Sequence, residues 1–186
     1  MKRYAIALAL IAALPFAASA ADGINYNYVQ GGYVATNTNG PDADGWGVNG
    51  SVAVSPNFHL LAEYTNQDVK HSSAGFDQWR IGGGYNTAVG KNTDFVADVA
   101  YDRYAVKHGG PKADGYSVET GVRSALMPNL EGYAKVGYMD TNKTSGEAYG
   151  RLGANVMFTQ NFGMNADVRL IQGGDKQWFV GPRFTW

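Results

Sequence analysis

The last ten residues of the chain, Gln177-Trp178-Phe179-Val180-Gly181-Pro182-Arg183-Phe184-Thr185-Trp186, carry the clearest structural signal in the sequence. Counted back from Trp186, every second residue is apolar, and the residues between them are small, polar or charged, with Phe179 as the exception. A period of two indicates a β-strand with one apolar and one polar face. A final aromatic residue on such a strand is typical of the closing strand of a bacterial outer-membrane barrel. The alternative is a half-buried strand of a soluble sandwich.

The other end of the chain has the features of a secretory signal peptide. Lys2 and Arg3 precede an apolar run over 4–14, and small residues over 18–20 provide a cleavage site after Ala20. The run is too short to span a bilayer as a helix, and no later segment has the roughly 20 apolar residues that a spanning helix needs. We therefore predict a signal peptide over 1–20 and an exported barrel over 21–186, which contacts the membrane through strands.

The composition argues against several classes of function. Without residues 1–20 the chain has thirteen basic and sixteen acidic residues, a net charge of −3, and no basic patch that would bind nucleic acid. It has no cysteine, and hence no disulfide, thiolate nucleophile or thiolate metal ligand. The 25 glycines, 12 tyrosines and 17% charged residues suit a barrel with a polar interior. We predict no cofactor and no metal site.

Alternation of apolar and polar residues continues along the chain after the signal peptide. It predicts ten strands, with eight as the alternative, each close to the roughly 9 to 11 residues that a tilted strand needs to cross a membrane. The first strand is the least regular, and we place Val29, Gly31, Tyr33 and Ala35 on its outer face. The predicted strands cover 24–36, 45–54, 58–65, 78–86, 94–102, 116–123, 130–138, 149–158, 162–170 and 177–186.

The connections between the predicted strands alternate between short and long. The short turns repeat an asparagine, at positions Asn57, Asn92, Asn129 and Asn161. The long connections are polar loops over 37–43, 69–75, 105–113, 140–146 and 172–176. Short turns at one rim and longer loops at the other are typical of a transmembrane barrel, in which an even strand number returns both termini to the periplasmic side.

A sheet in hydrocarbon must close on itself, because each unpaired backbone group there is costly. We therefore predict an all-β, up-and-down antiparallel transmembrane barrel. Its outward aromatic residues are predicted to lie at the two membrane interfaces. The belt near the turns consists of Phe58, Phe95, Phe162 and Trp186, and the belt near the loops of Trp46, Tyr64, Trp79, Tyr101, Tyr116, Tyr138 and Trp178.

The inward residues decide whether the barrel holds a pore. They include seven acids, Asp94 and Glu131 among them, and six bases. A narrow lumen of low dielectric tolerates charges only when they are paired, so we predict a lumen that ion pairs largely plug. The predicted network consists of Glu63, Arg80, Asp98, Asp102, Glu119, Arg123, Lys135, Arg151, Asp167, Arg169 and Arg183. A narrow path for water or small solutes is the alternative.

The three histidines are the candidate catalytic residues. His71 and His108 fall in predicted external loops near Asp68, Ser72 and Asp114, and a histidine beside a carboxylate can act as a general base. Because these loops are too short to wall a substrate cleft, we expect solvated histidines, with a surface hydrolase as the second alternative. His59 is expected to hydrogen-bond in the lumen.

Several segments resemble the Ax-twenty-one family of xanthomonad-type outer-membrane proteins. They are 21–37 (ADGINYNYVQGGYVATN), 77–80 (DQWR), 114–119 (DGYSVE) and 177–186 (QWFVGPRFTW). The resemblance implies a small outer-membrane barrel associated with diffusible-signal regulation, quorum sensing, virulence and plant immune recognition. The segment around Tyr26 corresponds to the family's proposed signalling peptide, whereas the alternation here predicts a membrane strand. Gln30 departs from the acidic residue that the family often has.

Together these observations predict a non-enzymatic, monomeric outer-membrane barrel in a Gram-negative envelope, also released in outer-membrane vesicles. Its role would lie in envelope integrity or surface interaction. Its expected partners are outer-membrane lipid, lipopolysaccharide and, through the C-terminal strand, the barrel assembly machinery. The residues do not identify a ligand of the external loops.

Overall fold

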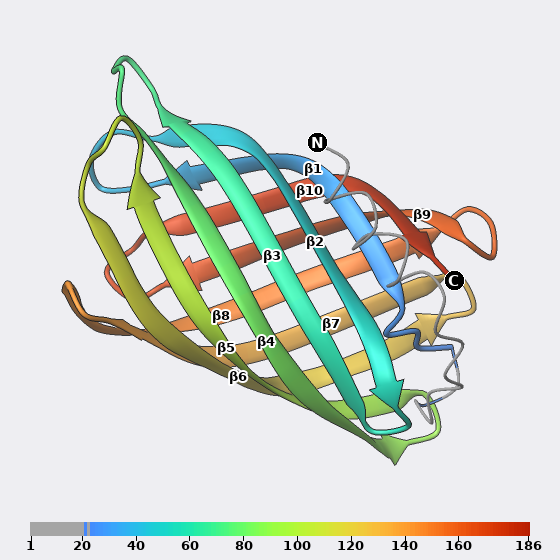
Figure 1. Cartoon of the computed structure of the whole chain (residues 1–186). Helices are drawn as coiled ribbons and strands as arrows, with labels where there is room; N and C mark the ends of the chain where they lie inside the picture. Colours follow the sequence, from blue (N-terminus) through green and yellow to red (C-terminus); the bar gives the residue numbers. More distant parts are fainter. Residues whose placement is uncertain (1–20, 22) are drawn as a thin grey trace, which may run out of the picture.

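The computed structural model describes residues 21 and 23–186, which form a closed antiparallel barrel (Figure 1). Each strand pairs with its neighbours in sequence, and β1 pairs with β10 to close the sheet. This confirms an up-and-down barrel of ten strands rather than eight. The strands are β1 (Tyr28–Asn37), β2 (Ala43–Ser55), β3 (Phe58–Val69), β4 (Gly75–Gly90), β5 (Thr93–Val106), β6 (Lys112–Met127), β7 (Leu130–Thr141), β8 (Thr144–Met157), β9 (Phe162–Ile171) and β10 (Lys176–Thr185).

The connections define two ends of the barrel, which we call the turn end and the loop end. The turn end has the connections 56–57, 91–92, 128–129 and 158–161, together with residues 23–27 and Trp186. The loop end has 38–42, 70–74, 107–111, 142–143 and 172–175. The predicted loop over 140–146 is wrong, because β7 and β8 stay paired as far as Thr141 and Thr144. The predicted signal peptide over 1–20 lies outside the described residues.

The strands carry their apolar side chains outward and their polar side chains inward. In β10, burial alternates residue by residue from Trp178 to Thr185, with Phe179 on the inner face. Val136, Val99 and Ile81 on the outer face are 64%, 58% and 57% exposed. So large an apolar exterior is stable only against an apolar solvent, and it is therefore the surface of a membrane-spanning barrel. No helix in residues 21 and 23–186 is long and apolar enough to cross a membrane.

The outward aromatic residues gather near both ends. At the loop end, the Tyr64 ring lies between those of Trp46 and Trp79, with centroid distances of 5.3 and 4.4 Å. At the turn end, Phe58 packs on Tyr85 at 5.3 Å. Tyr64 and Trp186 are half-buried. The other predicted belt residues are exposed on the outer face: Trp46, Phe58, Trp79, Phe95, Tyr101, Tyr116, Tyr138, Phe162 and Trp178.

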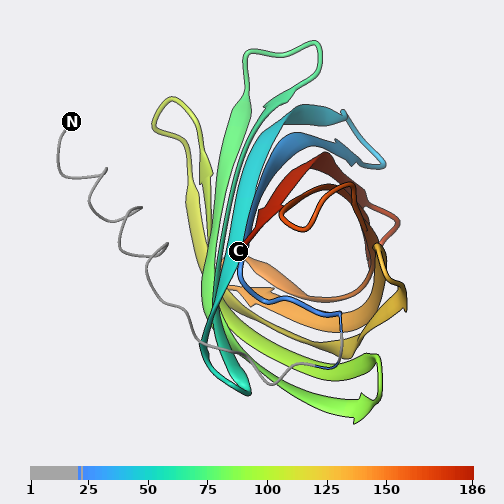
Figure 2. The same cartoon turned by 90° about the vertical axis from the view of Figure 1, so that its right-hand side faces the viewer.

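Residues 24–27 are not part of the first strand, so that strand was predicted to begin too early. Figure 2 looks into the turn end, where this segment, in blue, runs across part of the opening before β1 starts. Ile24 and Tyr26 are buried and pack with Ala21, Ala53 and Val96. Over 24–27 the side chains of Ile24 and Tyr26 pack inside the turn end of the barrel, whereas those of Asn25 and Asn27 hydrogen-bond to backbone groups of the barrel. A strand shows the same alternation of apolar and polar residues, which explains why the first strand was predicted to begin too early.

Gly181 lies on the seam where β1 and β10 close the barrel. A Cβ atom there would lie 2.1 Å from the Gly31 carbonyl oxygen and 2.6 Å from Gly32 Cα, closer than real contacts allow. Overpacking costs about 1–3 kcal/mol, so we expect Gly181→Ala to lower the unfolding temperature by about 5 °C. The measurement is the temperature at which the purified barrel shifts to its unfolded gel mobility.

Gly31→Ala is the matched control on the same seam. Its added Cβ would meet only the Gly47 carbonyl oxygen, at 3.6 Å, which is ordinary van der Waals contact. We expect no loss of stability from it. Equal losses in the two variants would show that the seam is not as tightly packed as described.

Candidate functional site

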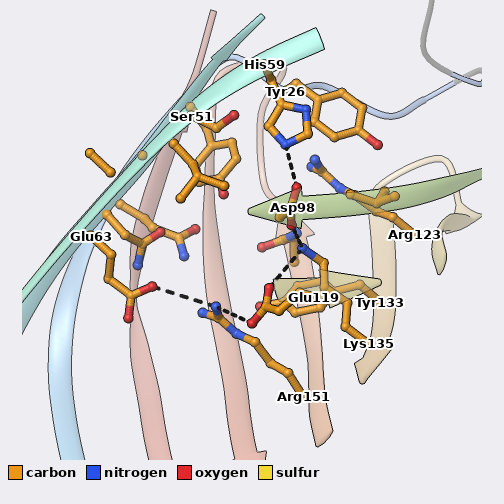
Figure 3. Close-up of a pocket in the computed structure, with 18 of the residues that line it drawn as sticks. Tyr26, Ser51, His59, Glu63, Asp98, Glu119, Arg123, Tyr133, Lys135 and Arg151 are labelled. Carbon is orange, nitrogen blue, oxygen red and sulfur yellow. Dashed lines mark hydrogen bonds and ion pairs between the residues drawn. The ribbon is translucent and has the colours of Figure 1, made fainter. Parts of the chain in front are cut away.

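The charged side chains of the lumen converge on Glu119 of β6 (Figure 3). Its carboxylate lies 3.1 Å from Arg80 Nη1 and 3.5 Å from Lys135 Nζ. Guanidinium nitrogens of Arg151 and Arg169 approach it to 3.9 Å. The side chain of Glu119 is 2% exposed. One buried carboxylate is thus shared by four cations, which come from β4, β7, β8 and β9.

Asp98 of β5 extends this network toward the turn end. It accepts a hydrogen bond of 2.6 Å from Lys135 Nζ, and its other oxygen lies 3.0 Å from His59 Nε2. His59 Nδ1 lies 3.3 Å from the side-chain oxygen of Asn86. Lys135 therefore joins two buried carboxylates, Asp98 and Glu119, and His59 takes the place in the lumen that the sequence predicted.

Arg151 of β8 connects opposite parts of the wall. Its Nη2 donates to Asp167 on β9 at 2.8 Å, and its Nη1 lies 3.7 Å from Glu63 on β3. The Tyr133 hydroxyl also donates to Asp167, at 2.8 Å. The network therefore crosses the lumen instead of only lining it.

A second cluster lies nearer the turn end. Arg123 of β6 makes a bidentate pair with Glu131 of β7, with hydrogen bonds of 2.6 and 2.8 Å. The Arg123 guanidinium also lies over the Tyr26 ring, 4.5 Å from its centroid. Asn155 donates to the same carboxylate at 2.7 Å. Glu131 is the ion-pair partner of Arg123, and the predicted network omitted it, although the alternation places its side chain on the inner face.

Two predicted members of the network, Asp102 and Arg183, lie in the lumen without an ion pair among the described residues. Asp102 accepts a hydrogen bond from the Ser117 hydroxyl. Arg183 lies 3.6 Å from the centroid of the Tyr28 ring and donates to the side-chain oxygen of Gln30 at 3.1 Å. Their assignment as ion pairs is wrong, because neutral hydrogen-bonding groups and an aromatic face satisfy them. The other nine members each have an opposite charge within 4.0 Å.

The network leaves little open space in the middle of the barrel. A cavity of about 70 Å³ lies there, lined by Arg80, Arg151 and their partners. At the loop end a vestibule of about 390 Å³ opens above Arg169, between Tyr104, Met139 and other side chains. One water needs roughly 10–15 Å³, so the central cavity has room for a few waters. The Nε atoms of Arg80, Arg151 and Arg169 have no hydrogen-bond partner among the described residues, and water could satisfy them.

Among the described residues, His71 and His108 form no ion pair with Asp68 or Asp114, the carboxylates near them in the sequence. Asp68 pairs with Lys107, and Asp114 accepts a hydrogen bond from Tyr101. His71 and His108 are exposed and have positive φ angles of 60° and 58°. Within residues 21 and 23–186, no group of three or more His, Cys, Asp or Glu side chains is placed to hold a metal ion.

Comparison with known proteins returns barrels of low similarity. No family model and no curated protein matches the sequence. Among solved structures, the NanC porin is 11% identical with a TM-score of 0.49, over 86% of this chain and 100% of that one. The KdgM porin is 10% identical with a TM-score of 0.47, over 85% and 99%. OprG from Pseudomonas aeruginosa is 9% identical with a TM-score of 0.46, over 91% and 99%.

Proposed function

We propose that the protein is a non-enzymatic barrel of the Gram-negative outer membrane whose lumen is plugged by its own charged side chains. The apolar exterior, the aromatic groups near both ends and the closed sheet support the location. The observation that carries the proposal of a closed lumen is the sharing of Glu119 by four cations from different strands.

Such an arrangement opposes conduction for an electrostatic reason. Arg151 bridges Asp167 on one side of the lumen and Glu63 on another, so an ion could pass only by displacing pairs that are nearly buried. Removing one partner of a buried pair leaves an uncompensated charge, which is strongly unfavourable. The network therefore favours a rigid plug over a pore.

The protein's proposed role is in envelope integrity or surface interaction, as a monomer embedded in outer-membrane lipid and lipopolysaccharide. Its C-terminal strand, with the exposed Trp178 and Phe184 and the final Trp186, would engage the barrel assembly machinery. The family resemblance supports a further proposal of association with quorum sensing, virulence and outer-membrane vesicles.

The proposed role in envelope integrity has a direct test. Cells that lack the protein should be more sensitive to detergents and large antibiotics than wild-type cells, and complementation should reverse this.

The plug is tested by conductance. We expect the purified barrel, inserted in planar bilayers, to give no unitary current steps at voltages at which a large porin conducts in the same membranes. Insertion is verified independently by the heat-dependent gel mobility of the reconstituted protein. Reproducible steps whose size grows with salt concentration would contradict the closed lumen.

A narrow water path is the second candidate, favoured by the central cavity and by the unpartnered guanidinium nitrogens. It predicts a different result from the same preparation. Proteoliposomes would shrink faster than protein-free liposomes after an osmotic step, while planar bilayers still show no ionic current. Equal shrinkage rates would leave the plugged barrel as the better description.

A further inference from the structure

Asp94 of β5 is a buried carboxylate without a charged partner among the described residues. It is 0% exposed. One carboxylate oxygen accepts a hydrogen bond of 2.9 Å from the backbone nitrogen of Ala21, and the other accepts one of 3.0 Å from the Tyr26 hydroxyl. Both donors are neutral in the chain of 186 residues. Arg123 of β6 stands opposite Asp94 in the strand register, but its guanidinium is engaged by Glu131 at 2.6 and 2.8 Å, and no ion pair joins it to Asp94 among the described residues.

A buried carboxylate of this kind is unfavourable unless a cation compensates it. The nitrogen of Ala21 is an uncharged amide as long as residue 20 is attached. Cleavage after Ala20, which the sequence predicts, converts that same nitrogen into an α-ammonium group. The position of Ala21 against Asp94 therefore supplies the missing cation without any rearrangement of the barrel.

We propose that Asp94 is the binding site for the α-amino group that cleavage after Ala20 creates, and that this ion pair fixes Ala21 and the segment 23–27 at the turn end. The peptide bond between Ala20 and Ala21 is hydrolysed by an export peptidase. Water adds to the Ala20 carbonyl carbon, the carbon–nitrogen bond breaks, Ala20 leaves as a carboxylate, and the Ala21 nitrogen is released as an amine that is protonated.

The surrounding contacts hold the amino group in place. Gly23 has a φ of +85°, which favours glycine, and the Ile24 N–H donates to the Ala21 carbonyl at 3.1 Å. This turn directs the Ala21 nitrogen toward Asp94. Arg123 and Arg183 both donate to the Asn25 carbonyl, at 2.8 and 3.3 Å. The segment is thus fixed to the wall of the barrel before the charge appears.

Asparagine side chains tie the same segment to the C-terminus and to β2. Asn25 Nδ2 donates to the Trp186 carbonyl at 3.1 Å, and the backbone nitrogen of Trp186 donates to the Asn27 carbonyl at 3.3 Å. The Ala53 N–H donates to the Asn27 side chain at 2.9 Å. The ion pair would therefore join β5 to a segment that already contacts β2 and the C-terminus. Removal of the signal peptide would therefore complete the closure of the turn end.

The ion pair between the α-amino group and Asp94 makes a pH-dependent contribution to the free energy of unfolding. An α-amino group has an ordinary pKa of about 7.7–8.0, and pairing with Asp94 raises the pKa of this group in the folded state. The contribution is therefore complete below the unfolded-state pKa and is lost as pH rises through the folded-state pKa. The other titratable or charged groups near the site are Tyr26, His59, Arg123 and Glu131. Burial raises the pKa of Tyr26 above its ordinary value, so its hydroxyl stays protonated over this range.

The experiment compares three forms of the refolded barrel in detergent micelles. They are the mature chain starting at Ala21, the same chain with its α-amino group acetylated, and Asp94→Asn. We expect the mature chain to react with an aldehyde selective for α-amino groups about tenfold more slowly than Asp94→Asn. We also expect its unfolding temperature to exceed that of the acetylated form by about 10 °C at pH 7, as for loss of a buried ion-pair partner, and the difference to shrink by pH 10.

Tyr26→Phe is the matched control, because it removes the other donor to Asp94 and leaves the charge pair intact. It should keep the pH-dependent difference between free and acetylated forms. If Asp94→Asn does not fold, a mature chain with one additional N-terminal residue replaces it, since this displaces the ammonium group and leaves Asp94 unchanged. Equal reaction rates, or equal unfolding temperatures of free and acetylated chains over the whole range, would overturn the proposal. Neither readout depends on whether the lumen conducts.

Discussion

Val99→Arg is expected to destabilise the barrel by about 2–4 kcal/mol, the cost of a charged side chain on the lipid face near the midplane of a membrane. Val99 is 58% exposed on β5, between Phe95 near the turn end and Tyr101 near the loop end. On a soluble protein, a substitution at so exposed a site would change stability by roughly 0.5 kcal/mol or less. The measurement is reversible unfolding by denaturant in lipid vesicles.

Val89→Arg is the matched control for this prediction. Val89 is the same residue type, is 63% exposed, and lies at the turn-end limit of β4. The cost of arginine near an interface falls to about 0–1 kcal/mol, so we expect the two variants to differ clearly in lipid. If both are equally well tolerated, the outer face does not contact hydrocarbon, and the transmembrane assignment fails.

Glu119→Gln is expected to cost about 3–5 kcal/mol, because it removes the charge from a buried group that four cations share while keeping its size. The two nearest cations are Arg80, at 3.1 Å, and Lys135, at 3.5 Å. Arg80 would then lose the one ion pair that it has among the described residues, whereas Lys135 would keep Asp98, at 2.6 Å. We expect a marked fall in the denaturant midpoint and, in the fraction that folds, current steps that the wild-type barrel lacks.

Asp175→Asn provides the comparison for Glu119→Gln. Asp175 lies in the connection between β9 and β10 at the loop end, and the same loss of one negative charge there should change stability by less than about 1 kcal/mol. If Glu119→Gln is as stable as Asp175→Asn and still does not conduct, the lumen is closed by packing rather than by paired charges.

The alternation of residues was sufficient to predict most of the wall, because a strand has a period of two and this barrel has one apolar and one polar face. It placed Val180 and Phe184 outside, and Arg183 and Thr185 inside, as the burial of β10 shows. It failed over residues 24–27, where a segment inside the mouth shows the same alternation as a strand. The loop predicted over 140–146 was also too long, because polar residues at the end of a strand resemble a loop when their backbone pairing is unknown.

The fold class and the inward side of the seven acids and six bases follow from local periodicity and turn residues, so they could be predicted from the sequence. The choice of ten strands over eight, and the pairing of the charges, came from the three-dimensional arrangement. Glu119 gathers cations from four other strands, Arg183 finds Gln30 and the Tyr28 ring, and Asp94 meets the Ala21 nitrogen, 73 residues away. Such partners depend on strand register and on the closure of the sheet, since these bring side chains from distant positions together across a narrow lumen.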